Sequence, residues 1–362
     1  MDELKIAREE ISNADAEIAR LFVKRMKAVA TVAEYKKKHG LPIYDKEREL
    51  ALLNRAGELV DDPEIREFYT VFQENTMAVS RSYQERLMQG MRVAYSGTEG
   101  AFAHIASNRL FPTAIKVSYP DFSEAYAAVC RGECDVAVLP IENSYNGEVG
   151  QVSDLMFSGT LFVNEITDVA ITQDLLGVKG ASIDSVKTIV SHPQALGQCR
   201  NYISEHGFEA KEYANTALAA KMVAELGDAS VAAIASAEAA EIFGLEVLER
   251  NINESRMNTT RFAVFSRVEN RHQKNDMGVH TVLLFTVRNE AGALAKAIDV
   301  IGRHGFNMRS IRSRPMKELL WQYYFYVEAE GNLYTDEGRE MMAELMQYCD
   351  RLKAVGTYVK GE

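Results

Sequence analysis

The sequence is poor in cysteine and has no long apolar run. Its four cysteines, Cys130, Cys134, Cys199 and Cys349, are scattered over 362 residues and form neither a disulfide framework nor a paired metal-ligand motif. No apolar stretch could span a bilayer, and no basic and apolar leader opens the chain. We therefore expect a cytoplasmic protein with reduced, mostly structural cysteines and no metal site.

The chain lacks an excess of positive charge, since 52 acidic residues outnumber 41 lysines and arginines. The formal net charge of -11 argues against nucleic acid or an anionic membrane surface as the main partner. An anionic ligand would therefore have to be met by local arginines. With 47% hydrophobic and 26% charged residues, a chain of this length is expected to form two or three globular domains.

Residues 1–89 have the pattern of a wholly helical domain. Apolar residues recur at helical spacing over 7–38, which predicts one long helix. A second helical stretch covers about 45–59, and "DDPE" at 61–64 places an aspartate and a proline where a third helix would begin. Because three helices enclose a small core, we expect dimerisation through the long helix.

The remainder of the chain predicts two further domains. Short apolar strands alternate with helical stretches over 91–268, which indicates an α/β domain. The polar run "ENRHQKND" at 269–276 reads as a linker. Residues 279–362 follow the order strand, helix, strand, strand, helix and strand, with the last strand at 354–359, which is typical of a small ferredoxin-like α+β domain.

Basic residues on the first predicted helix could address a ligand. Arg25 and Lys36 are eleven residues apart, so at about 100° per residue they lie within roughly 20° of each other. Arg8 points about 100° away from Arg25 and could share that ligand only if another subunit supplied it. The alternative is an ordinary solvated charged face.

Further polar residues make this segment resemble the all-helical chorismate mutase class. Asp45, Arg48 and Glu49 follow a short loop after the first predicted helix. Ser80 and Gln84 lie at i, i+4 spacing on the third predicted helix. The resemblance implies that Arg8, from the partner subunit, and Arg25 hold the two substrate carboxylates. It implies that Lys36 and Gln84 contact the ether oxygen and that Glu49 accepts from the substrate hydroxyl. Asp45, Arg48 and Ser80 would complete the pocket.

Such a set is sufficient for a pericyclic rearrangement, which needs neither a nucleophile nor a proton transfer. A millionfold acceleration requires about 8 kcal/mol. A few charged hydrogen bonds of about 1.5 to 3 kcal/mol each could supply it by favouring the bent transition state.

Three polar motifs mark the α/β segment: "ENS" at 142–144, "SHPQALGQC" at 191–199 and "NTTRF" at 258–262. Ser191 follows an apolar strand and precedes Pro193, so we expect it where a helix begins and backbone amides could meet a carboxylate. Gln198 comes about two turns later and returns to nearly the same face. The alternative is a simple helix cap followed by an exposed glutamine.

The order and wording of these motifs resemble prephenate dehydratase, which converts prephenate to phenylpyruvate with loss of carbon dioxide and hydroxide. The resemblance implies two α/β lobes, as in periplasmic binding proteins, with the site in the cleft between them. It implies that Ser191 and Gln198 bind the substrate, that Asn143 is a pocket amide, and that Thr260 helps the hydroxide depart. Arg261 either holds a substrate carboxylate or ties the motif down.

Two rival assignments involve the second motif. His192 is the only titratable side chain inside it that could act as general acid, and we rank it below Thr260. Cys199 with His192 could suggest thiol catalysis, but a buried structural cysteine is much commoner. The loop "GTEGAFAH" at 97–104 departs from the family in lacking hydroxyls at Ala101 and Ala103, so it is left out of the expected site.

The last segment resembles the amino-acid-binding ACT domain. Two segments resemble the effector-binding motifs of that domain, "GALAKAI" at 292–298 and "SIRSRP" at 310–315. The resemblance implies that phenylalanine binds as effector at Gly292, Ala293, Leu294, Ser313, Arg314 and Pro315. Arg312 stands where the family usually has glutamate. The alternative is a purely structural dimerisation module.

The sequence thus predicts a multidomain protein with an all-α domain, a two-lobed α/β domain and an α+β ferredoxin-like domain. We expect a bifunctional, feedback-regulated homo-oligomer, dimer or tetramer, that acts on chorismate and prephenate without a cofactor. One rival is a dehydratase preferring arogenate, although no pocket group for the extra amine can be named. The other is a ligand sensor without turnover, which would not need to keep Thr260, Asn143, Ser191 and Gln198.

Overall fold

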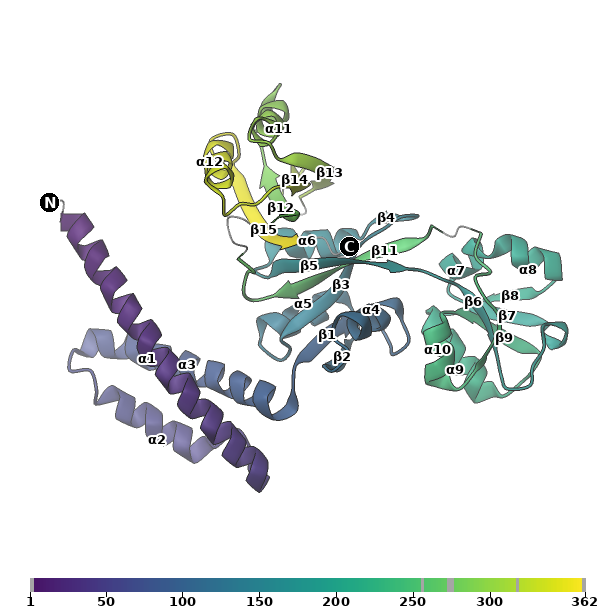
Figure 1. The fold of residues 1–362 in the computed structure, drawn as a ribbon, viewed down its shortest axis with the longest axis horizontal. Helices are drawn as coiled ribbons and strands as arrows, with labels where there is room; N and C mark the ends of the chain where they lie inside the picture. Colours follow the sequence, from purple (N-terminus) through teal and green to yellow (C-terminus); the bar gives the residue numbers. More distant parts are fainter. Residues whose placement is uncertain (1–2, 255–256, 272–276, 317–318, 360–362) are drawn as a thin grey trace. The chain divides into compact units, whose positions relative to one another are not determined.

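The computed structural model describes residues 3–254, 257–271, 277–316 and 319–359. The chain divides into two compact units, Met1–Met91 and Arg92–Glu362, which are described separately (Figure 1). The first is helical and the second is built on three sheets.

The helical unit consists of α1 (Glu3–His39), α2 (Lys46–Gly57) and α3 (Pro63–Gln89), which confirms the predicted three helices. Helix α3 begins where the sequence indicated, because Asp62 accepts hydrogen bonds from two backbone amides of the first turn and Pro63 occupies the first helical position. Both α1 and α2 pack against α3.

The core of the helical unit is small. Among the residues whose burial is described, its buried side chains are Ala33 on α1 and Met77, Ser80 and Gln84 on α3. Large apolar side chains along α1 are exposed instead, among them Ile11, Ile18, Leu21 and Phe22. The exposed apolar side chains agree with the expectation that these three helices alone enclose little.

The second unit opens with a lobe that uses both ends of the α/β segment. Its sheet has the order β2-β1-β3-β11-β5, with β4 paired to β3. The strands are β1 (Arg92–Ser96), β2 (Ile115–Tyr119), β3 (Val136–Asn143), β4 (Gly147–Glu148), β5 (Phe162–Ala170) and β11 (Thr259–Ser266). Three helices pack on it, α4 (Phe102–Leu110), α5 (Phe122–Cys130) and α6 (Gly150–Ser158). Strand β11 returns antiparallel between β3 and β5, which brings the third motif beside the first.

The intervening chain forms a second lobe. Its sheet has the order β10-β6-β9-β7-β8, and the two α/β lobes confirm the predicted segment. The strands are β6 (Asp174–Gly177), β7 (Thr188–Ser191), β8 (Glu209–Glu212), β9 (Val231–Ala235) and β10 (Glu246–Glu249). The helices are η1 (Ile183–Ser185), α7 (Pro193–Gln198), α8 (Arg200–His206), α9 (Thr216–Leu226) and α10 (Ala237–Phe243).

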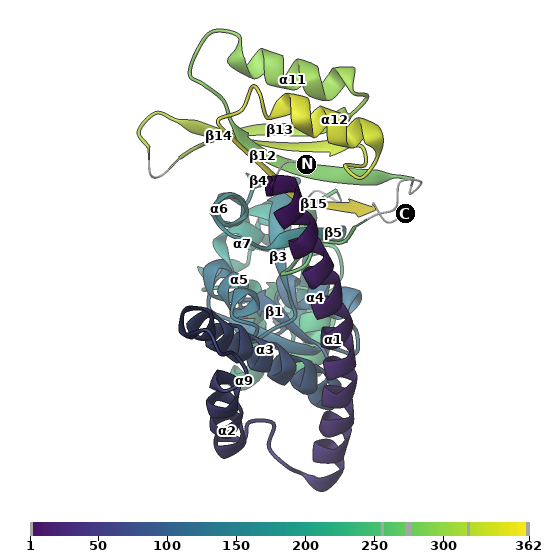
Figure 2. The same cartoon turned by 90° about the vertical axis from the view of Figure 1, so that its left-hand side faces the viewer.

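The C-terminal domain has the predicted order of strand, helix, strand, strand, helix and strand. Its elements are β12 (Val279–Thr286), α11 (Ala293–Arg303), β13 (Asn307–Pro315), β14 (Tyr323–Glu330), α12 (Asp336–Leu345) and β15 (Arg351–Val359). The antiparallel sheet runs β13-β14-β12-β15, and both helices cover one face (Figure 2). Most of the predicted linker, 272–276, lies outside the described residues.

The opposite face of the C-terminal sheet packs on the first lobe. One hydrophobic core joins Val282, Tyr326 and Tyr358 of that sheet to Leu139 and Phe265 of β3 and β11. Because β3 and β11 also carry the "ENS" and "NTTRF" motifs, the C-terminal sheet is packed directly behind the strands that hold them.

Candidate active sites

A cavity of about 330 Å³, here called the helical cavity, lies among the three helices of the first unit. Its charged and polar lining consists of Arg25, Lys36, Asp45, Arg48, Glu49, Ser80, Arg81 and Gln84. Four of these side chains are basic and two are acidic, so the lining carries a net positive charge. The cavity therefore favours an anionic ligand.

Ser80 and Gln84 are buried on α3 and fix the floor of the helical cavity. The Arg25 guanidinium donates to Ser80 Oγ, which in turn donates to Thr76 O at 2.7 Å. Gln84 Nε2 donates to Ser80 O at 3.4 Å, while Gln84 Oε1 has no partner among the described residues. A buried amide with one unsatisfied end is suited to bind a polar ligand atom.

The loop between α1 and α2 shapes the other wall. Lys36 Nζ donates to Ile43 O at 2.6 Å, and Asp45 Oδ1 accepts from the backbone amide of Arg48 at 3.0 Å, so Asp45 caps α2. Arg81 pairs with Glu49. Sequence reasoning missed Arg81, because a residue next to Ser80 on a helix points about 100° away from it.

Arg8 does not line the helical cavity. It lies on the same helix as Arg25, seventeen residues earlier, a rise of roughly 25 Å at 1.5 Å per residue. Within one chain it cannot reach the ligand that Arg25 would hold. Supply of Arg8 by a partner subunit stays a prediction.

A second cavity, here called the interlobe cavity, has a volume of about 460 Å³ and is lined from both lobes. Its polar lining includes Ser96, Asn143, Asn146, Glu148, Gln173, His192, Gln194, Gln198, Asn215, Thr216, Asn258 and Thr260. The structure thus brings three of the sequence-predicted residues, Asn143, Gln198 and Thr260, into one cavity. Of these, Asn143 and Thr260 face each other directly across β3 and β11.

The Asn143 side chain fixes the hydrogen-bonding state of Thr260. Asn143 Oδ1 accepts from the backbone amides of Tyr145 at 3.0 Å and Asn146 at 2.9 Å, which orients the amide. Asn143 Nδ2 then donates to Thr260 Oγ1 at 2.9 Å. Because the hydroxyl oxygen already accepts, its hydrogen is available, and no group in the described part of the chain takes it. Thr260 is therefore prepared to donate into the cavity.

Three buried amide atoms in the cavity lack a partner among the described residues: Gln173 Oε1, Gln198 Nε2 and Asn258 Nδ2. Gln173 Nε2 donates weakly to Gln198 Oε1 at 3.4 Å. Leaving such groups unpaired costs about 1–3 kcal/mol each, which a polar ligand would recover. Sequence reasoning missed Gln173, which belongs to none of the three motifs.

Two helices begin at the interlobe cavity without a side-chain cap. Ala101 precedes α4 and Val149 precedes α6, and both residues line the cavity. An uncapped helix start presents free backbone amides and about half a positive charge, which suits a carboxylate. None of the described lining residues is lysine or arginine, so the expectation that local arginines meet the anion is not met here. The loop at 97–104, left out of the expected site, contributes to it through its backbone.

The second motif is arranged differently from the expectation. Ser191 ends β7, is fully buried and donates to Ile234 O at 2.6 Å. The residue that begins α7 is His192, whose Nδ1 accepts from Gln194 N at 3.3 Å and which lines the cavity. Ser191 is one residue too early to cap the helix, and its hydroxyl pairs with the neighbouring strand. Burial raises the pKa of the Cys199 thiol to about 12, which opposes thiol catalysis.

Comparison with known proteins identifies both cavity-bearing segments. Residues 7–85 match chorismate mutase type II and residues 93–270 match prephenate dehydratase. The bifunctional chorismate mutase/prephenate dehydratase of Aquifex aeolicus (strain VF5) is 32% identical, with 99% of this chain and 99% of the relative covered. The chain belongs to the bifunctional chorismate mutase/prephenate dehydratase family. It is an enzyme of phenylalanine biosynthesis with both activities.

Solved structures match the second unit. The prephenate dehydratase from Arthrobacter aurescens, in complex with L-Phe, is 26% identical with a TM-score of 0.69, covering 75% of this chain and 90% of that one. A structure named "GqqA- a novel type of quorum quenching acylases" is 31% identical with a TM-score of 0.69, covering 75% and 98%. Two structures with the same similarity to this chain are thus described by different activities, so the fold alone does not identify the function. The assignment to the bifunctional family rests instead on the match over 99% of the chain.

In this chorismate mutase/prephenate dehydratase, Arg261 turns to the C-terminal domain. It is absent from the cavity lining, and its Nη1 and Nη2 donate to Glu328 Oε2 and Oε1 at 2.8 Å each. Nη2 also donates to Tyr358 OH at 3.1 Å. Arg261 was expected either to hold a substrate carboxylate or to fix the position of the motif. These contacts correspond to the second role, because the guanidinium binds protein side chains.

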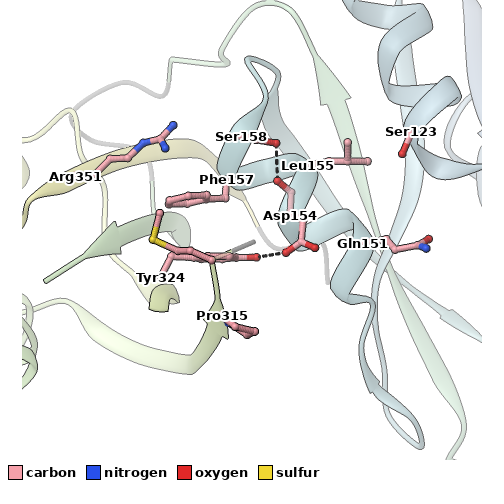
Figure 3. Close-up of a pocket in the computed structure, with 10 residues that line it drawn as sticks. Ser123, Gln151, Asp154, Leu155, Phe157, Ser158, Pro315, Tyr324 and Arg351 are labelled. Atoms are coloured by element: carbon pink, nitrogen blue, oxygen red, sulfur yellow. Dashed lines mark hydrogen bonds between the residues drawn. The ribbon is translucent and has the colours of Figure 1, made fainter. Parts of the chain in front are cut away.

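The expected effector residues lie on both faces of the C-terminal sheet. Gly292 has φ 83° and precedes α11, and Leu294 packs into the core beneath the helices. Arg314 lies on the other face, where its Nε donates to Asp154 Oδ1 of α6 at 3.1 Å. Nearby, Pro315 lines a cavity of about 510 Å³ between β13 and α6 (Figure 3).

One group of potential metal ligands lies in the C-terminal domain. Among the described residues, ligand atoms of His304, Glu337 and Glu340 lie within 4.8 Å of one another, on and beside the helices of the C-terminal domain. These residues line neither active-site cavity. No described helix has the length and apolarity to cross a membrane.

Proposed function

We propose that Thr260 assists departure of the substrate hydroxide in the dehydratase reaction. The electron pair of the bond between the prephenate ring and its carboxylate moves into the ring, carbon dioxide leaves, and the C4 hydroxyl departs with its bonding electron pair as hydroxide, which takes a proton from solvent after release. The Thr260 hydroxyl hydrogen stabilises the developing hydroxide. Because the product ring becomes aromatic, modest polarisation of this leaving group is sufficient.

The observation that carries this proposal is the 2.9 Å hydrogen bond from Asn143 Nδ2 to Thr260 Oγ1. It occupies an acceptor site of the hydroxyl and strengthens it as a donor. His192 is the weaker candidate for general acid. Its Nδ1 already accepts from Gln194 N at the start of α7, so only one ring nitrogen is left to face the substrate.

The remaining cavity groups bind the substrate. Its carboxylate and oxopropanoate groups are taken by the uncapped starts of α4 and α6 and by the unsatisfied amides of Gln198 and Asn258. Ser191 supports this arrangement from behind, through β9, and has no direct contact with the substrate.

Kinetics with supplied prephenate test the role of Thr260. Thr260→Val keeps the shape of the side chain and removes the hydroxyl, and it should lower kcat by about 10²- to 10³-fold, the usual effect of losing a donor to a developing oxyanion. Thr260→Ser, the matched control, should retain most of kcat. Equal activity of both variants and the wild type would exclude the proposed role.

We propose further that the helical cavity carries the mutase reaction with the roles that the resemblance implies. Arg25 holds a substrate carboxylate, Lys36 and Gln84 contact the ether oxygen, and Glu49 accepts from the substrate hydroxyl. Support comes from their common position in one positively charged cavity. The Gln84 side-chain NH2 has two hydrogens and makes one long contact, 3.4 Å to Ser80 O, so it can also donate to the ether oxygen. Arg25→Ala should abolish chorismate turnover and leave dehydration of supplied prephenate unchanged; loss of both activities would count against separate sites.

We also infer that the C-terminal domain is an ACT domain that binds phenylalanine as a feedback inhibitor. The ferredoxin-like topology supports this, as does the L-Phe complex of the Arthrobacter aurescens dehydratase. Binding would engage Gly292, Ala293 and Leu294 at the start of α11 and Ser313, Arg314 and Pro315 on β13. Leu294 lies on the side of the sheet that the helices cover and Arg314 on the other side, so one ligand cannot contact both of these side chains within one chain.

A calorimetric titration with phenylalanine, paired with a dehydratase assay, tests this inference. We expect saturable heat and inhibition over the same concentration range, and loss of both in Gly292→Val, because a β-branched residue is strained at a φ of 83° and would distort the helix start. Absence of heat and of inhibition in the wild type would overturn it.

A further inference from the structure

A buried ion-pair network joins the C-terminal sheet to the dehydratase lobe. Glu328 on β14 is 4% exposed and binds Arg261 of β11 through two hydrogen bonds of 2.8 Å. Tyr358 of β15 donates to Glu328 Oε1 at 2.6 Å. Burial alone would raise the pKa of Glu328, but hydrogen bonds from Arg261 and Tyr358 outweigh it and lower the pKa, so this carboxylate stays charged.

Arg312 extends the network to the first motif. Its Nη2 lies 2.5 Å from Glu142 Oε2, and the same carboxylate oxygen lies 3.4 Å from Arg261 Nη1. The Arg312 guanidinium also lies over the Tyr326 ring, 5.2 Å from its centroid. Two positive and two negative side chains thus alternate across the domain boundary. A glutamate at position 312, as is usual in the ACT family, would face Glu142 with like charge.

The two dehydratase members of this network adjoin the active-site pair. Glu142 precedes Asn143 on β3, and Arg261 follows Thr260 on β11. The ladder pairs Thr260 with Asn143 and Arg261 with Glu142. Since successive side chains of a strand point to opposite faces, the network holds one face of the ladder while Asn143 and Thr260 line the cavity on the other.

The ladder is also irregular at this point. The register between β3 and β11 shifts immediately after Arg261, between Arg261 and Phe262. An irregular ladder re-aims side chains and has fewer backbone hydrogen bonds to fix them. On its other side β11 pairs with β5 in regular register here, so the irregularity lies between β11 and β3 alone. The approach of Thr260 to Asn143 across that irregular pair therefore depends more on what holds Arg261 and Glu142 than it would in a regular ladder.

We propose that Glu328 and Arg312 of the C-terminal sheet are positioning residues of the dehydratase site, holding Arg261 and Glu142 so that Asn143 and Thr260 keep their contact. The inference rests on the proposed role of Thr260. Without Glu328, the acidic partners left to Arg261 among the described residues are Glu142 at 3.4 Å and Asp168 at 3.6 Å, and β11 shifts toward them. Neither positioning residue touches the substrate.

The boundary offers a matched control that lies outside this network. Tyr324 of β14 donates to Asp154 Oδ1 of α6 at 2.9 Å (Figure 3). Tyr324→Phe removes one partly buried hydrogen bond between the C-terminal sheet and the first lobe, and this bond involves none of the four network residues. A general loosening of the boundary would affect Tyr324→Phe as much as Glu328→Gln.

The test uses the full chain with supplied prephenate and separates kcat from KM. Glu328→Gln and Arg312→Glu should each lower kcat at least tenfold with KM changed less than threefold, because the substrate carboxylates bind elsewhere in the cavity. Arg312→Lys, which keeps the charge, should recover most of kcat, and Tyr324→Phe should stay within twofold of the wild type. Chorismate consumption should be unchanged in all four.

Measuring Thr260→Val in the same assay distinguishes failure of the positioning role from failure of the proposed role of Thr260. If Thr260→Val is inactive while Glu328→Gln and Arg312→Glu keep wild-type kcat, the positioning role is overturned and the site assignment stands. If Thr260→Val is fully active, the site assignment fails. Should Glu328→Gln show no cooperative thermal transition, the graded series at Arg312, which is 18% exposed, still decides the question.

Discussion

Asn143 and Thr260 stand opposite each other on adjacent antiparallel strands, and the amide of Asn143 donates to the threonine hydroxyl oxygen over 2.9 Å. The direction of this bond matters for the chemistry. It leaves the hydroxyl hydrogen for the substrate, and it depends on an amide nitrogen at position 143.

Asn143→Asp tests that direction with nearly no change of shape. A carboxylate would accept the Thr260 hydrogen instead of donating to the oxygen, so the hydrogen would no longer reach the leaving hydroxyl. We expect kcat for prephenate to fall by about 10²-fold or more. Steady-state assays of the purified variant would measure this, and an unchanged kcat would show that the bond does not direct the hydroxyl.

Mixing two inactive mutase variants tests whether Arg8 comes from the partner subunit. If each site takes Arg8 from one chain and Lys36 from the other, Arg8→Ala and Lys36→Ala should each be inactive alone. Equal mixing after subunit exchange should restore about a quarter of wild-type mutase activity, since half of the dimers are mixed and each has one intact site. No recovery, despite proven exchange, would place Arg8 outside the site.

Substitution of Ser191 should affect mainly stability, and substitution of Gln198 should affect mainly the KM for prephenate. Ser191→Ala leaves Ile234 O without its buried donor and should cost about 1–3 kcal/mol of stability, with little change in KM for prephenate. Gln198→Leu should raise KM about five- to tenfold, the effect of one lost hydrogen bond of about 1–1.5 kcal/mol. Thermal unfolding and steady-state kinetics of both variants distinguish these outcomes. A large KM effect in Ser191→Ala would instead support direct substrate binding.

Acid stability should depend on Glu328. Its pKa is lower folded than unfolded, so the stability it contributes is fully present above the unfolded value of about 4.3 and is lost as pH falls through the folded value. The melting temperature of the wild type should therefore fall more steeply below about pH 4.3 than that of Glu328→Gln. Parallel pH profiles would show that Glu328 does not titrate as described.

Local signals predicted much of the fold. The start of α3 follows from Asp62 and Pro63, whose capping and φ preferences act within one turn. The strand and helix order of the C-terminal domain follows from the hydrophobic periodicity of each element. Both kinds of signal are local in the sequence and need no knowledge of tertiary packing.

The candidate site was less predictable where tertiary packing or the backbone decides. Ser191 is buried because β7 pairs with β9, which no motif in the sequence reveals. The start of α4 lines the cavity through its backbone amides, which every residue type carries. The side chain of Ala101 therefore gives no indication in the sequence that this segment belongs to the site. The sequence shows that Arg312 departs from the glutamate usual at this position. Its contact with Glu142 joins two domains, and no pattern of neighbouring residues indicates such a contact.

A single time course with chorismate as the only substrate tests the central claim most directly, that one chain holds two separate active sites. Wild type, Thr260→Val and Arg25→Ala would be followed for chorismate, prephenate and phenylpyruvate. We predict that Thr260→Val consumes chorismate at the wild-type rate and accumulates prephenate, while Arg25→Ala leaves chorismate untouched yet dehydrates added prephenate. Loss of both activities in either variant, or phenylpyruvate formed at the wild-type rate by Thr260→Val, would contradict the account.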